Sequence, residues 1–448
     1  MKSKSLYLFV LIVLFITIPA FSQKQLSKDE FIADIDSLYA AIYEIHPDMF
    51  AEYPQDNFEK DINNIKASLK DSLTVWDFYK KMTPLVVRLG DGHTRMSFPS
   101  QILETSNAPL FPFTVKIDKI DHSLKIDKDL SPGKTKILPG YKILSINGKK
   151  AEELINEFIE YESGEKMDFR LGGLEYYFAH YLYMKYGDAP LVIRYSDTNN
   201  ASFTETIQPL PYSVRKKNMP QDNNQPGIYY TLSTDSINST AIINFESFSD
   251  FSKFETFLDS AFTQIKKQKI KNLIIDIRNN GGGNSALGDE LFQYISPVPF
   301  TQYGKVIVKY SNKLKSKMQN ITEPNGLVTY ENNDLIPLRD NTLRYNGNIY
   351  LLTSSHSFSS ATDFAWAFQY FKMGTIIGEE TGGLVVCFGD VLGQKLPNTE
   401  LVFGVSWKKF YGYGATDAHT HGVIPEYQTP ASEAMDFAIK SIKDKSYR

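Results

Sequence analysis

Residues 348–383 constrain the fold of this chain more than any other segment. They begin with a short apolar run, 349–352, of the kind found in a strand that is buried on both faces. A serine-rich turn follows at 354–360, and beyond it Phe364 and Phe368 recur at helical spacing. The pattern predicts a strand, a turn, a helix and a second strand, with a serine where the helix begins.

A serine at such a junction is well placed for nucleophilic catalysis. The first helical turn has free backbone N–H groups and the positive end of the helix dipole, which favour an alkoxide and an oxyanion. Serine is also a preferred helix cap, and Ser360 to Asp363 has the spacing of a capping box with Asp in place of Glu. Both roles stay open here for Ser354, Ser355, Ser357, Ser359 and Ser360.

The length of 448 residues exceeds a single typical core, so we expect several domains. Hydrophobic residues make up 42% of the chain and aromatic residues 13%, which suits folded domains. The predicted fold class is α/β, a multidomain α+β arrangement with an α/β domain at its C-terminal end. The predicted segments are a signal peptide at 1–22, a helical region at 23–100, a β domain at 101–212, a linker at 213–226 and the α/β domain at 227–448.

The first residues have the pattern of a secretory signal. A short basic region at 1–5 precedes a nearly all-apolar run at 6–18, and mostly small residues lead to a cleavage point after Ser22. The apolar run is short for a membrane span, which needs about 20 apolar residues. We therefore expect a periplasmic or secreted protein with no stable membrane insertion after cleavage.

Charge and cysteine content argue against several functions. Loss of Lys2 and Lys4 with the signal lowers the 48 basic groups by two, against 52 acidic groups, so the mature net charge is −6. There is no basic run, so nucleic acid is not an expected partner. The sole cysteine, Cys387, permits no internal disulfide and no cysteine-based zinc cluster, and its apolar neighbours predict a buried, inert thiol.

Three amphipathic helices, the last of them starting at a Thr-x-x-Asp capping box, are predicted near 31–45, 57–70 and 74–89. The sequence Gly-Asp-Gly-His-Thr follows at 90–94. His93 is thus held at the end of a rigid element yet can exchange protons, which suits a general base. The alternative is a surface-loop histidine with Asp91 as a turn residue.

Short alternating runs predict strands at 113–117, 124–126, 141–146 and 190–195, with a helix at 151–158. Within this region, residues 138–148 resemble the part of PDZ domains that leads into an Asn-Gly turn, with Tyr141 where an acidic residue is usual. PDZ domains add an extended peptide to a sheet edge, so peptide binding by this PDZ-like domain stays open.

A buried strand at 273–276 opens into Asn-Asn-Gly-Gly-Gly-Asn at 279–284, just before a predicted helix at 285–294. Glycines let backbone amides approach a ligand without side-chain obstruction. Their spacing fits neither a Walker loop nor GxGxxG. A pocket of amides for a carbonyl oxygen is the better interpretation, beside that of a plain glycine turn.

Four motifs occur in order: Gly-Asp-Gly-His-Thr at 90–94, Asp-Ile-Arg-Asn-Asn-Gly-Gly-Gly at 276–283, Ser-Phe-Ser-Ser-Ala at 357–361 and Gly-Glu-Glu-Thr-Gly at 378–382. With the PDZ-like segment, they resemble the C-terminal-processing, or tail-specific, serine peptidase family. The resemblance implies a crotonase- or ClpP-like catalytic domain, a polypeptide substrate and no cofactor. It places the nucleophile on Ser359 and the oxyanion hydrogen bonds on the amides of Gly282 and Ser360.

The bacterial tail-specific branch uses a lysine in its Gly-Glu-x-Thr-x-Gly-Lys motif, and this chain has Leu384 there. The chain is more similar to the tricorn-core-like branch, which pairs its serine with a histidine at the position of His93. A late carboxylate completes that network. The nearest one here is Asp417, ahead of the Gly-Val-Ile-Pro-Glu turn at 422–426, while Thr362 stands where the family often has glutamate.

Two other functions are considered. His419 and His421 would point to one face of a strand beside Asp417, which suits a metal-dependent hydrolase. The second is a non-catalytic ligand- or peptide-binding protein on the same scaffold, because Thr362 and the missing lysine depart from the family pattern.

The remaining polar and aromatic features have structural interpretations. The aromatic segment 407–413 predicts a packed hairpin, and Glu379 or Glu380 is expected to bind backbone amides or a basic neighbour. The histidines interpreted as structural are His46, His122, His180 and His356.

Overall fold

The structure is a computed structural model that describes residues 25–219 and 227–446. The predicted signal peptide with its cleavage point, and residues 220–226 of the predicted linker, lie outside the described residues. Of the helices in the described ranges, none combines the length and the apolar character that a membrane crossing requires. The fold class is mixed α/β in several units, as predicted.

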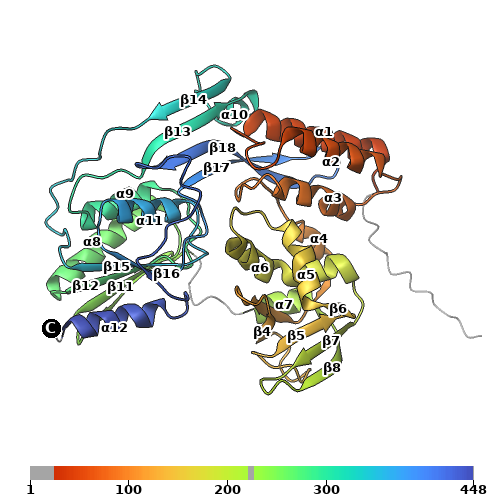
Figure 1. Cartoon of the computed structure of the whole chain (residues 1–448), viewed down its shortest axis with the longest axis horizontal. Coiled ribbons are helices and arrows are strands. Elements are labelled where there is room, and N and C mark those ends of the chain that lie inside the picture. Colours follow the sequence, from red (N-terminus) through yellow and green to blue (C-terminus); the bar gives the residue numbers. More distant parts are fainter. Residues whose placement is uncertain (1–24, 220–226, 447–448) are drawn as a thin grey trace, which may run out of the picture.

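The C-terminal α/β domain is built on a six-stranded sheet, seen on the left of Figure 1. Only the first pair of strands is antiparallel. The strands, in sheet order, are β10 (Tyr230–Asp235), β11 (Thr240–Phe245), β12 (Asn272–Asp276), β15 (Asn348–Thr353), β16 (Thr375–Gly378) and β19 (Tyr427–Gln428).

Helices cover both faces of this sheet (Figure 1). Three helices lie on one face: α8 (Phe251–Lys267), α9 (Ala286–Ile295) and α11 (Ser360–Tyr370). The other face is covered by α12 (Ala434–Ser446). The buried runs Leu273–Ile275 and Ile349–Leu352 are apolar because both faces of the sheet are covered.

A second sheet arches over the first, at the top of Figure 1. The pair β17 and β18 forms the predicted aromatic hairpin, since residues 407–412 lie in β18. Arg95 pairs with Gly404, so the N-terminal region contributes a strand to this sheet. Its strands are β1 (Arg95–Met96), β18 (Val402–Gly412), β13 (Tyr303–Tyr310), β14 (Gly326–Glu331) and β17 (Val386–Lys395), with α10 (Asn312–Lys317) after β13.

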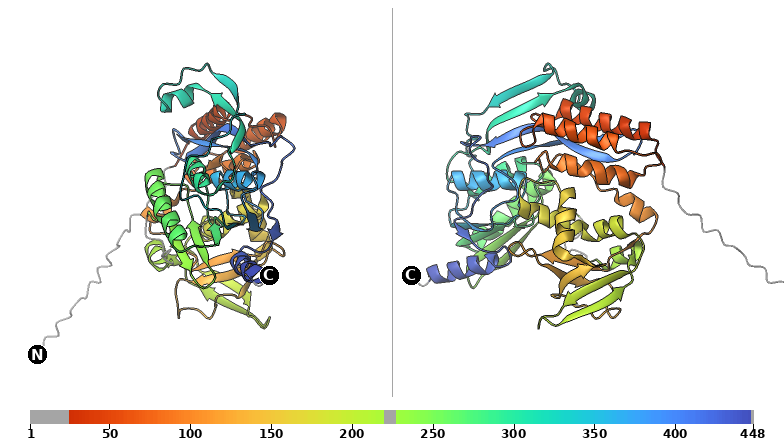
Figure 2. Two further views of the ribbon diagram at one scale, coloured as in Figure 1. Left: turned by 90° about the vertical axis from the view of Figure 1, so that its left-hand side faces the viewer. Right: turned by 45° about the vertical axis from the view of Figure 1, so that its right-hand side comes forward.

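The N-terminal helices lie against the far end of the second sheet, as the views of Figure 2 show. The predicted capping box at Thr74 and Asp77 forms and starts the third helix. A similar box, not predicted, starts the first helix at Ser27 and Glu30. The helices are α1 (Lys28–Ile45), α2 (Gln55–Ala67), α3 (Val75–Val87) and α4 (Ser100–Thr105).

The middle domain, from β2 to α7, holds a third sheet in the order β3-β4-β5-β7-β8, with β6 on β5. Helix α6 lies along the edge strand β3. The strands of the middle domain are β2 (Pro109–Leu110), β3 (Phe113–Ile117), β4 (Leu124–Asp129), β5 (Lys142–Ile146), β6 (Lys149–Lys150), β7 (Leu191–Ser196), β8 (Ser202–Ile207) and β9 (Leu210–Pro211), of which β2 and β9 pair with each other outside the third sheet. The helices of the domain are α5 (Ala151–Phe158), η1 (Ile159–Tyr161), α6 (Met167–Tyr186) and α7 (Tyr212–Asn218).

Part of the predicted linker is a helix that belongs to the middle domain. In α7, Arg215 is buried and its guanidinium donates to the carbonyl oxygens of Phe111 at 3.0 Å and Phe113 at 3.4 Å. The prediction of a linker from residue 213 is therefore wrong for this helix. The segment is polar because most of helix α7 is exposed, and the buried Arg215 guanidinium attaches the helix to the middle domain.

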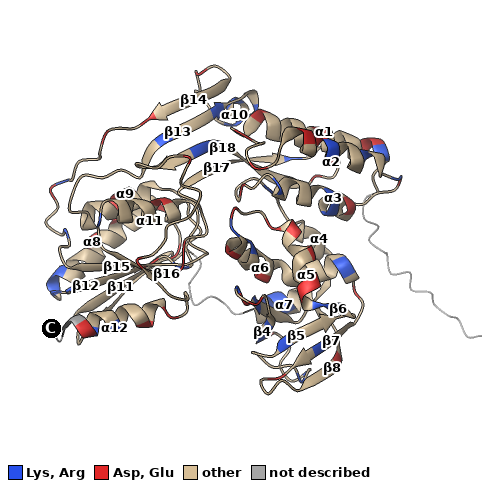
Figure 3. Ribbon diagram, in the orientation of Figure 1, with Lys and Arg blue, Asp and Glu red and all other residues tan. Residues whose placement is uncertain are grey.

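Two large hydrophobic cores follow the sheets rather than the predicted boundaries. One core joins the N-terminal helices, the middle domain and β17 and β18, and the other lies within the α/β domain. Acidic and basic residues are interspersed along the ribbon in both halves (Figure 3). The N-terminal helices and the β17–β18 hairpin thus share one core, and the predicted site residues His93 and Ser359 come from the N-terminal and C-terminal segments.

Candidate active site

Ser359 occupies a strained turn between β15 and α11. Its φ of 54° and ψ of −129° lie in a region that side chains other than glycine rarely adopt. Among the described residues, the hydroxyl of Ser359 makes no hydrogen bond, and the helix has no side-chain cap. The hydroxyl of Ser360 instead donates to the carbonyl oxygen of Gly283 at 2.7 Å. The capping-box interpretation of this segment is therefore wrong, and the Ser359 hydroxyl is free to react.

The glycine turn, residues 279–284, and the strand end before it hold the Ser359 turn in place through hydrogen bonds. The amide of Phe358 donates to the carbonyl oxygen of Asn280 at 3.0 Å, and the hydroxyl of Ser357 donates to that of Ile277 at 2.8 Å. Gly282 has a φ of 95°, and a Cβ atom there would lie 2.7 Å from the Cβ of Ser359. Only glycine fits this approach, which explains the glycine run.

The two predicted oxyanion donors differ in their hydrogen bonds. The amide of Gly282 donates to Oδ1 of Asn280 at 2.9 Å. The amides of Gly283 and Ser360 have no hydrogen-bond acceptor within the described ranges. Ser360 N would lie 3.0 Å from a Cβ on Gly282, so the two turns place amides close together. Gly282 would have to release Asn280 before it could bind an oxyanion.

His93 follows α3 and lies against the residue before Ser359. Its imidazole stacks on the ring of Phe358 with centroids 4.7 Å apart, and its side chain is 13% exposed. Burial lowers the pKa of His93, while the nearby Asp91 carboxylate opposes this effect. The imidazole is therefore mainly neutral at neutral pH, which is the protonation state that a general base needs.

Asp91 is a buried anion rather than an exposed turn residue. Its carboxylate accepts hydrogen bonds from the hydroxyl of Ser406 at 2.6 Å and the amide of Thr94 at 3.1 Å, and it lies 3.2 Å from Nε2 of His46. Burial acts to raise the pKa of Asp91, but the hydrogen bonds and the adjacent histidines outweigh it and hold the pKa well below its usual range. The surface-loop interpretation of this segment is therefore wrong.

His46 has the structural role predicted for it. Its Nδ1 accepts the amide of Asp48 at 3.1 Å, which leaves Nε2 to donate to Asp91. The ring also packs on Phe388 of β17, with centroids 4.4 Å apart. His46 thus anchors Asp91, which in turn holds the loop that carries His93.

Asp417 lies apart from the other predicted site residues. Its side chain is 70% exposed, and its carboxylate accepts hydrogen bonds from Nζ of Lys409 at 3.0 Å and the hydroxyl of Tyr411 at 2.7 Å. The charges that act on His93 belong to Asp91, Arg95 and Asp390 instead. In this conformation, the carboxylate nearest to Nδ1 of His93 in an ion-pair contact is Asp91, at 3.8 Å.

Two residues of the middle domain complete the surroundings of His93. The ring of Phe169 stacks on Phe358, the same ring that the His93 imidazole stacks on, with centroids 4.1 Å apart. Oε1 of Glu165 accepts the amide of Gly92 at 3.1 Å. Burial, together with the charge of Asp91, raises the pKa of Glu165 to about 8. Sequence reasoning missed both residues, because neither belongs to a recognisable motif.

The two glutamates after β16 connect the α/β domain to the middle domain, a link that was not predicted. Glu379 pairs with Lys119 and accepts the amide of Ala431 at 3.1 Å. Glu380 pairs with Lys166 and accepts the amide of Gly422 at 2.8 Å. These contacts confirm the interpretation of Glu379 and Glu380 as binders of amides and basic neighbours.

Thr362 is buried beneath the Ser359 turn. Its hydroxyl donates to the carbonyl oxygen of Ser357 at 3.1 Å. A Cβ on Gly383 would lie 2.7 Å from the Thr362 hydroxyl and 3.1 Å from the amide of Ser359. Thr362 therefore supports the turn, and the space around it is filled by the Gly382–Gly383 segment.

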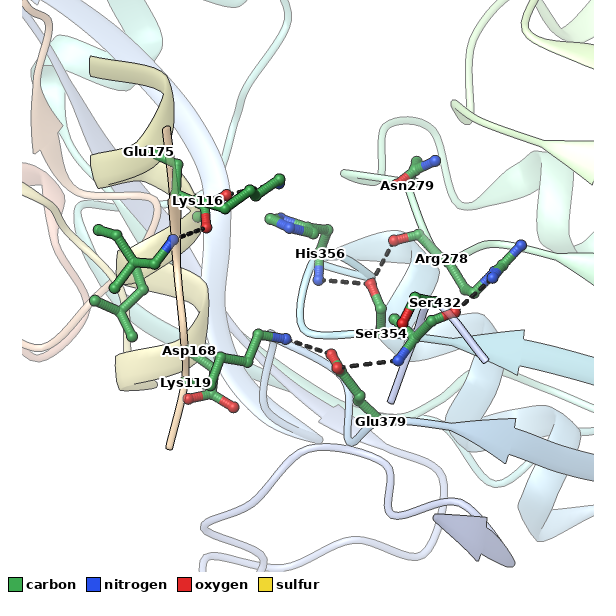
Figure 4. Close-up of a pocket in the computed structure, with 14 residues that line it drawn as sticks. Lys116, Lys119, Asp168, Glu175, Arg278, Asn279, Ser354, His356, Glu379 and Ser432 are labelled. Atoms are coloured by element: carbon green, nitrogen blue, oxygen red, sulfur yellow. Dashed lines mark hydrogen bonds and ion pairs between the residues drawn. The ribbon is translucent and has the colours of Figure 1, made fainter. Parts of the chain in front are cut away.

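A cavity of about 430 Å³ lies between β3 and α6 of the middle domain and the loops of the α/β domain (Figure 4). His356 faces it, and a Cβ on Gly172 of α6 would lie 2.3 Å from the His356 ring. Both charge signs line the cavity. Its charged residues are Lys116, Lys119, Asp168, Glu175, Arg278 and Glu379.

The predicted metal ligands are engaged in local hydrogen bonds. His419 lies at an exposed turn with its Nδ1 near Thr416, and Nδ1 of His421 is 2.6 Å from the carbonyl oxygen of Gly422. Over the part of the chain that the structure describes, the ligand spacing of a metal site occurs at Asp91, His93 and Glu165. The ligand atoms of these three residues lie within 4.8 Å of one another.

Comparison with known proteins bears on this geometry. Residues 239–429 match the model of peptidase family S41. The crystal structure of mature CPAF is similar, with a TM-score of 0.63 and 13% identity over 94% of this chain and 96% of that chain. The structure of mature CPAF complexed with lactacystin is similar too, with a TM-score of 0.62 and 14% identity over 94% of this chain and 97% of that chain. No curated protein sequence matches the chain significantly.

These matches confirm the predicted family and the predicted fold. The chain carries the domain of a serine-type peptidase, and its whole described fold, including the N-terminal and middle regions, is that of CPAF. The choice of a histidine base, and the role of each site residue, stay predictions.

Proposed function

We propose that this chain, a member of peptidase family S41, is an exported serine peptidase that hydrolyses peptide bonds through an acyl-enzyme. In this proposal Ser359 is the nucleophile and His93 is its general base. The observation that carries the proposal is the free hydroxyl of Ser359 in a strained turn, packed on Gly282 and followed by the free amide of Ser360.

The reaction would begin with attack of Ser359 Oγ on the peptide carbonyl carbon, while His93 takes the hydroxyl proton. His93 would then give this proton to the leaving amine as the C–N bond breaks. Water would hydrolyse the acyl-enzyme, with His93 again acting as base. Acylation and deacylation each begin with a neutral imidazole that accepts a proton, and burial favours that form.

The amide of Ser360 would bind the oxyanion, together with an amide of the glycine turn. Gly282 is the predicted donor and requires release of Asn280, whereas the amide of Gly283 is already free. Loss of one oxyanion donor typically raises the barrier by about 2.7–4 kcal/mol, so the glycine turn should matter nearly as much as the base.

The serine–histidine hydrogen bond is not formed in this conformation of the described residues, since Ser359 Oγ has no partner. Such bonds are often long before substrate binds and shorten in the complex. We propose that a polypeptide substrate closes this gap. Asp417 would join the network only if the turn that carries it moved, because Lys409 and Tyr411 hold its carboxylate here.

The proposal includes export, which rests on the signal-like residues 1–22. The middle domain would present the substrate, because α6 and β3 face the α/β domain across the cavity of Figure 4. A PDZ-like role for this domain is part of the proposal.

A fluorophosphonate probe on the purified mature chain tests the proposal. The probe should label the wild-type protein and leave the Ser359→Ala variant unlabelled, and cleavage of unstructured peptides should disappear in both Ser359→Ala and His93→Ala. Ser355→Ala, a neighbouring serine whose hydroxyl accepts from Lys119, is the matched control and should still be labelled. Equal peptide cleavage by all of these proteins would refute the assignment.

The free state of the serine hydroxyl also fits a second function, a non-catalytic binding protein on the same scaffold. In that case no conformation brings Ser359 and His93 together. Absence of labelling in the wild-type protein, combined with saturable peptide binding, would favour this alternative.

A further inference from the structure

We propose that Asp91, His93 and Glu165 bind one Zn²⁺ ion, and that the ion holds the peptidase in an inactive state. The metal site stands on the geometry of these three residues. Its inhibitory effect rests on the proposed function, because it requires His93 to be the general base.

The distances suit a small divalent ion. The three ligand atoms lie within 4.8 Å of one another, and Nδ1 of His93 is 3.8 Å from Oδ1 of Asp91. Ligand atoms at about 2.0–2.2 Å from a tetrahedral zinc ion lie roughly 3.4 Å from each other. Asp91 and His93 therefore need only a small inward shift to share an ion.

Two side-chain atoms of this cluster lack a hydrogen-bond partner among the described residues. Nδ1 of His93 and Oε2 of Glu165 are buried and have no hydrogen bond within the described residues. Buried side-chain polar atoms are nearly always hydrogen-bonded, so two such atoms in one cluster need an explanation. A shared metal ion would satisfy both at once, and a fourth position would remain for water.

The surroundings hold the two carboxylates in place for a ligand. Ser406, the Thr94 amide and His46 bind Oδ2 of Asp91, while Oδ1 accepts the backbone amide of His93 at 2.8 Å and keeps a second lone pair toward the His93 ring. The Gly92 amide binds Oε1 of Glu165 and leaves Oε2 free. Partners that orient the ligands in this way are a regular part of metal sites.

Gly92 has a specific place in this arrangement. A Cβ atom there would lie 2.8 Å from Oε2 of Glu165 and 2.8 Å from the ring of Phe358. A larger residue would push Glu165 out of the cluster. The glycine before His93 thus lets a residue of the middle domain reach the histidine.

The ligand types favour zinc over the hard cations. One imidazole with two carboxylates suits zinc and related transition metals, whereas calcium takes 6–8 oxygen ligands and magnesium usually keeps several waters. Zinc on Nδ1 would withdraw electron density from the ring and lower the proton affinity of its other nitrogen. Zinc would therefore suppress the base without blocking Ser359.

Isothermal titration of Zn²⁺ into the chelator-treated mature chain tests the site. The wild-type protein should bind one ion, and Ca²⁺ should give no signal. Loss of a residue that only orients a ligand typically costs 10–100-fold in metal affinity, so Glu165→Gln should cost at least about 100-fold. Glu160→Gln, which changes an exposed glutamate of η1 close by in the sequence, is the matched control and should bind zinc normally.

Three results would overturn the site. They are no binding by the wild-type protein, equal affinity in the wild-type and Glu165→Gln proteins, and loss of binding in a His421→Ala variant. The visible spectrum of Co²⁺ in the wild-type protein is a second measurement that needs no variant. Tetrahedral d–d bands would support a nitrogen and oxygen site of low coordination number, and a purely octahedral spectrum would contradict it.

Probe labelling and peptide cleavage separate the site from its effect. Zinc should slow peptide cleavage by the wild-type protein, a chelator should restore it, and Glu165→Gln should be resistant to zinc. If zinc binds but Ser359 is never labelled, the peptidase proposal fails and the metal site stands. If Ser359 is labelled and zinc binds without slowing cleavage, the inhibitory role fails.

Discussion

The imidazole of His93 stacks on the phenyl ring of Phe358, with ring centroids 4.7 Å apart. Phe169 stacks on Phe358 as well, with centroids 4.1 Å apart. Because Phe358 directly precedes Ser359, one aromatic side chain connects the proposed base, the proposed nucleophile and the middle domain. The position of His93 relative to Ser359 therefore depends on packing between three regions of the chain.

Replacement of Phe358 by alanine should separate these regions. A displacement of about 1 Å in a reacting group can cost about 100-fold in rate, so we expect kcat/KM for a peptide to fall by about this factor. The loss of a buried phenylalanine also lowers stability by about 3–5 kcal/mol, so activity has to be measured well below the melting temperature. Tyr176→Ala, at an aromatic residue of α6 that is 67% exposed, should have little effect on either quantity.

A Phe358→Leu variant sharpens this test. Leucine keeps most of the buried volume but loses the flat ring on which the imidazole stacks. We expect a smaller loss of stability than in Phe358→Ala and still a clear loss of kcat/KM. An unchanged kcat/KM in both variants would mean that the stack does not position His93.

The glycine turn offers a matched pair of variants. Gly282→Ala places a Cβ 2.7 Å from the Ser359 Cβ at a φ of 95°, whereas a Cβ on Gly281 meets no atom within 4 Å. We expect Gly282→Ala to lower kcat by at least about 100-fold, comparable with the loss of an oxyanion donor, and Gly281→Ala to keep most of the activity. Single-turnover acylation rates measure the difference. Equal rates in the two variants would show that Gly282 has no special role.

Local sequence patterns predicted much of the α/β domain. The strand from Asn348 and the helix after the serine turn occur as β15 and α11, and the helix predicted at 285–294 occurs as α9, Ala286–Ile295. These elements have periodic apolar residues and clear end signals, which act over a few residues. The family match at 239–429 covers this same part of the chain.

Helix α6 was not predicted, although it supplies the wall of the cavity and carries Phe169. Its two central glycines, Gly172 and Gly173, are unfavourable in helices. Both positions require glycine because a Cβ on Gly172 would lie 2.3 Å from the His356 ring, and a Cβ on Gly173 would lie 2.3 Å from the Glu162 carboxylate. Contacts between residues so distant in sequence have no local signal, and the same is true of Glu165 with Gly92.

The contact between Lys119 and Glu379 should couple the middle domain to the α/β domain. The two side chains are 32% and 23% exposed, so solvent screens the pair only in part. A double-mutant cycle with Lys119→Met and Glu379→Gln should give a coupling free energy of about 1 kcal/mol in thermal or denaturant unfolding. The exposed pair Lys395 and Glu400, within the β17–β18 hairpin, is the control and should give less.

This coupling should also disappear in acid. Burial acts to raise the pKa of Glu379, but Lys119 and the amides of Ala431 and Ser355 outweigh it and lower the pKa. A lowered pKa gives stability that is present above the ordinary glutamate pKa and is lost as the pH falls through the lowered value. A coupling energy that persists at a pH well below the lowered pKa would contradict the ionic interpretation.

Asp363 should make the folded protein less stable as the pH rises. Burial raises its pKa from 3.8 to about 7, although the Tyr303 hydroxyl donates to it at 2.7 Å. A raised pKa gives stability that is complete below the unfolded value and is lost as the pH rises through the folded value. Between these two pKa values the loss amounts to about 4 kcal/mol, at about 1.4 kcal/mol for each pH unit.

An Asp363→Asn variant removes this dependence and keeps an acceptor for Tyr303. We expect its melting temperature to exceed that of the wild-type protein by an amount that grows from pH 4 to pH 7 and then levels off, because the wild-type carboxyl is ionised above its folded pKa. Asp56→Asn, at an exposed position of α2, should show no such growth. A constant difference between Asp363→Asn and the wild-type protein over this range would mean that the Asp363 carboxyl is ionised throughout, and that an interaction other than the Tyr303 hydrogen bond compensates its burial.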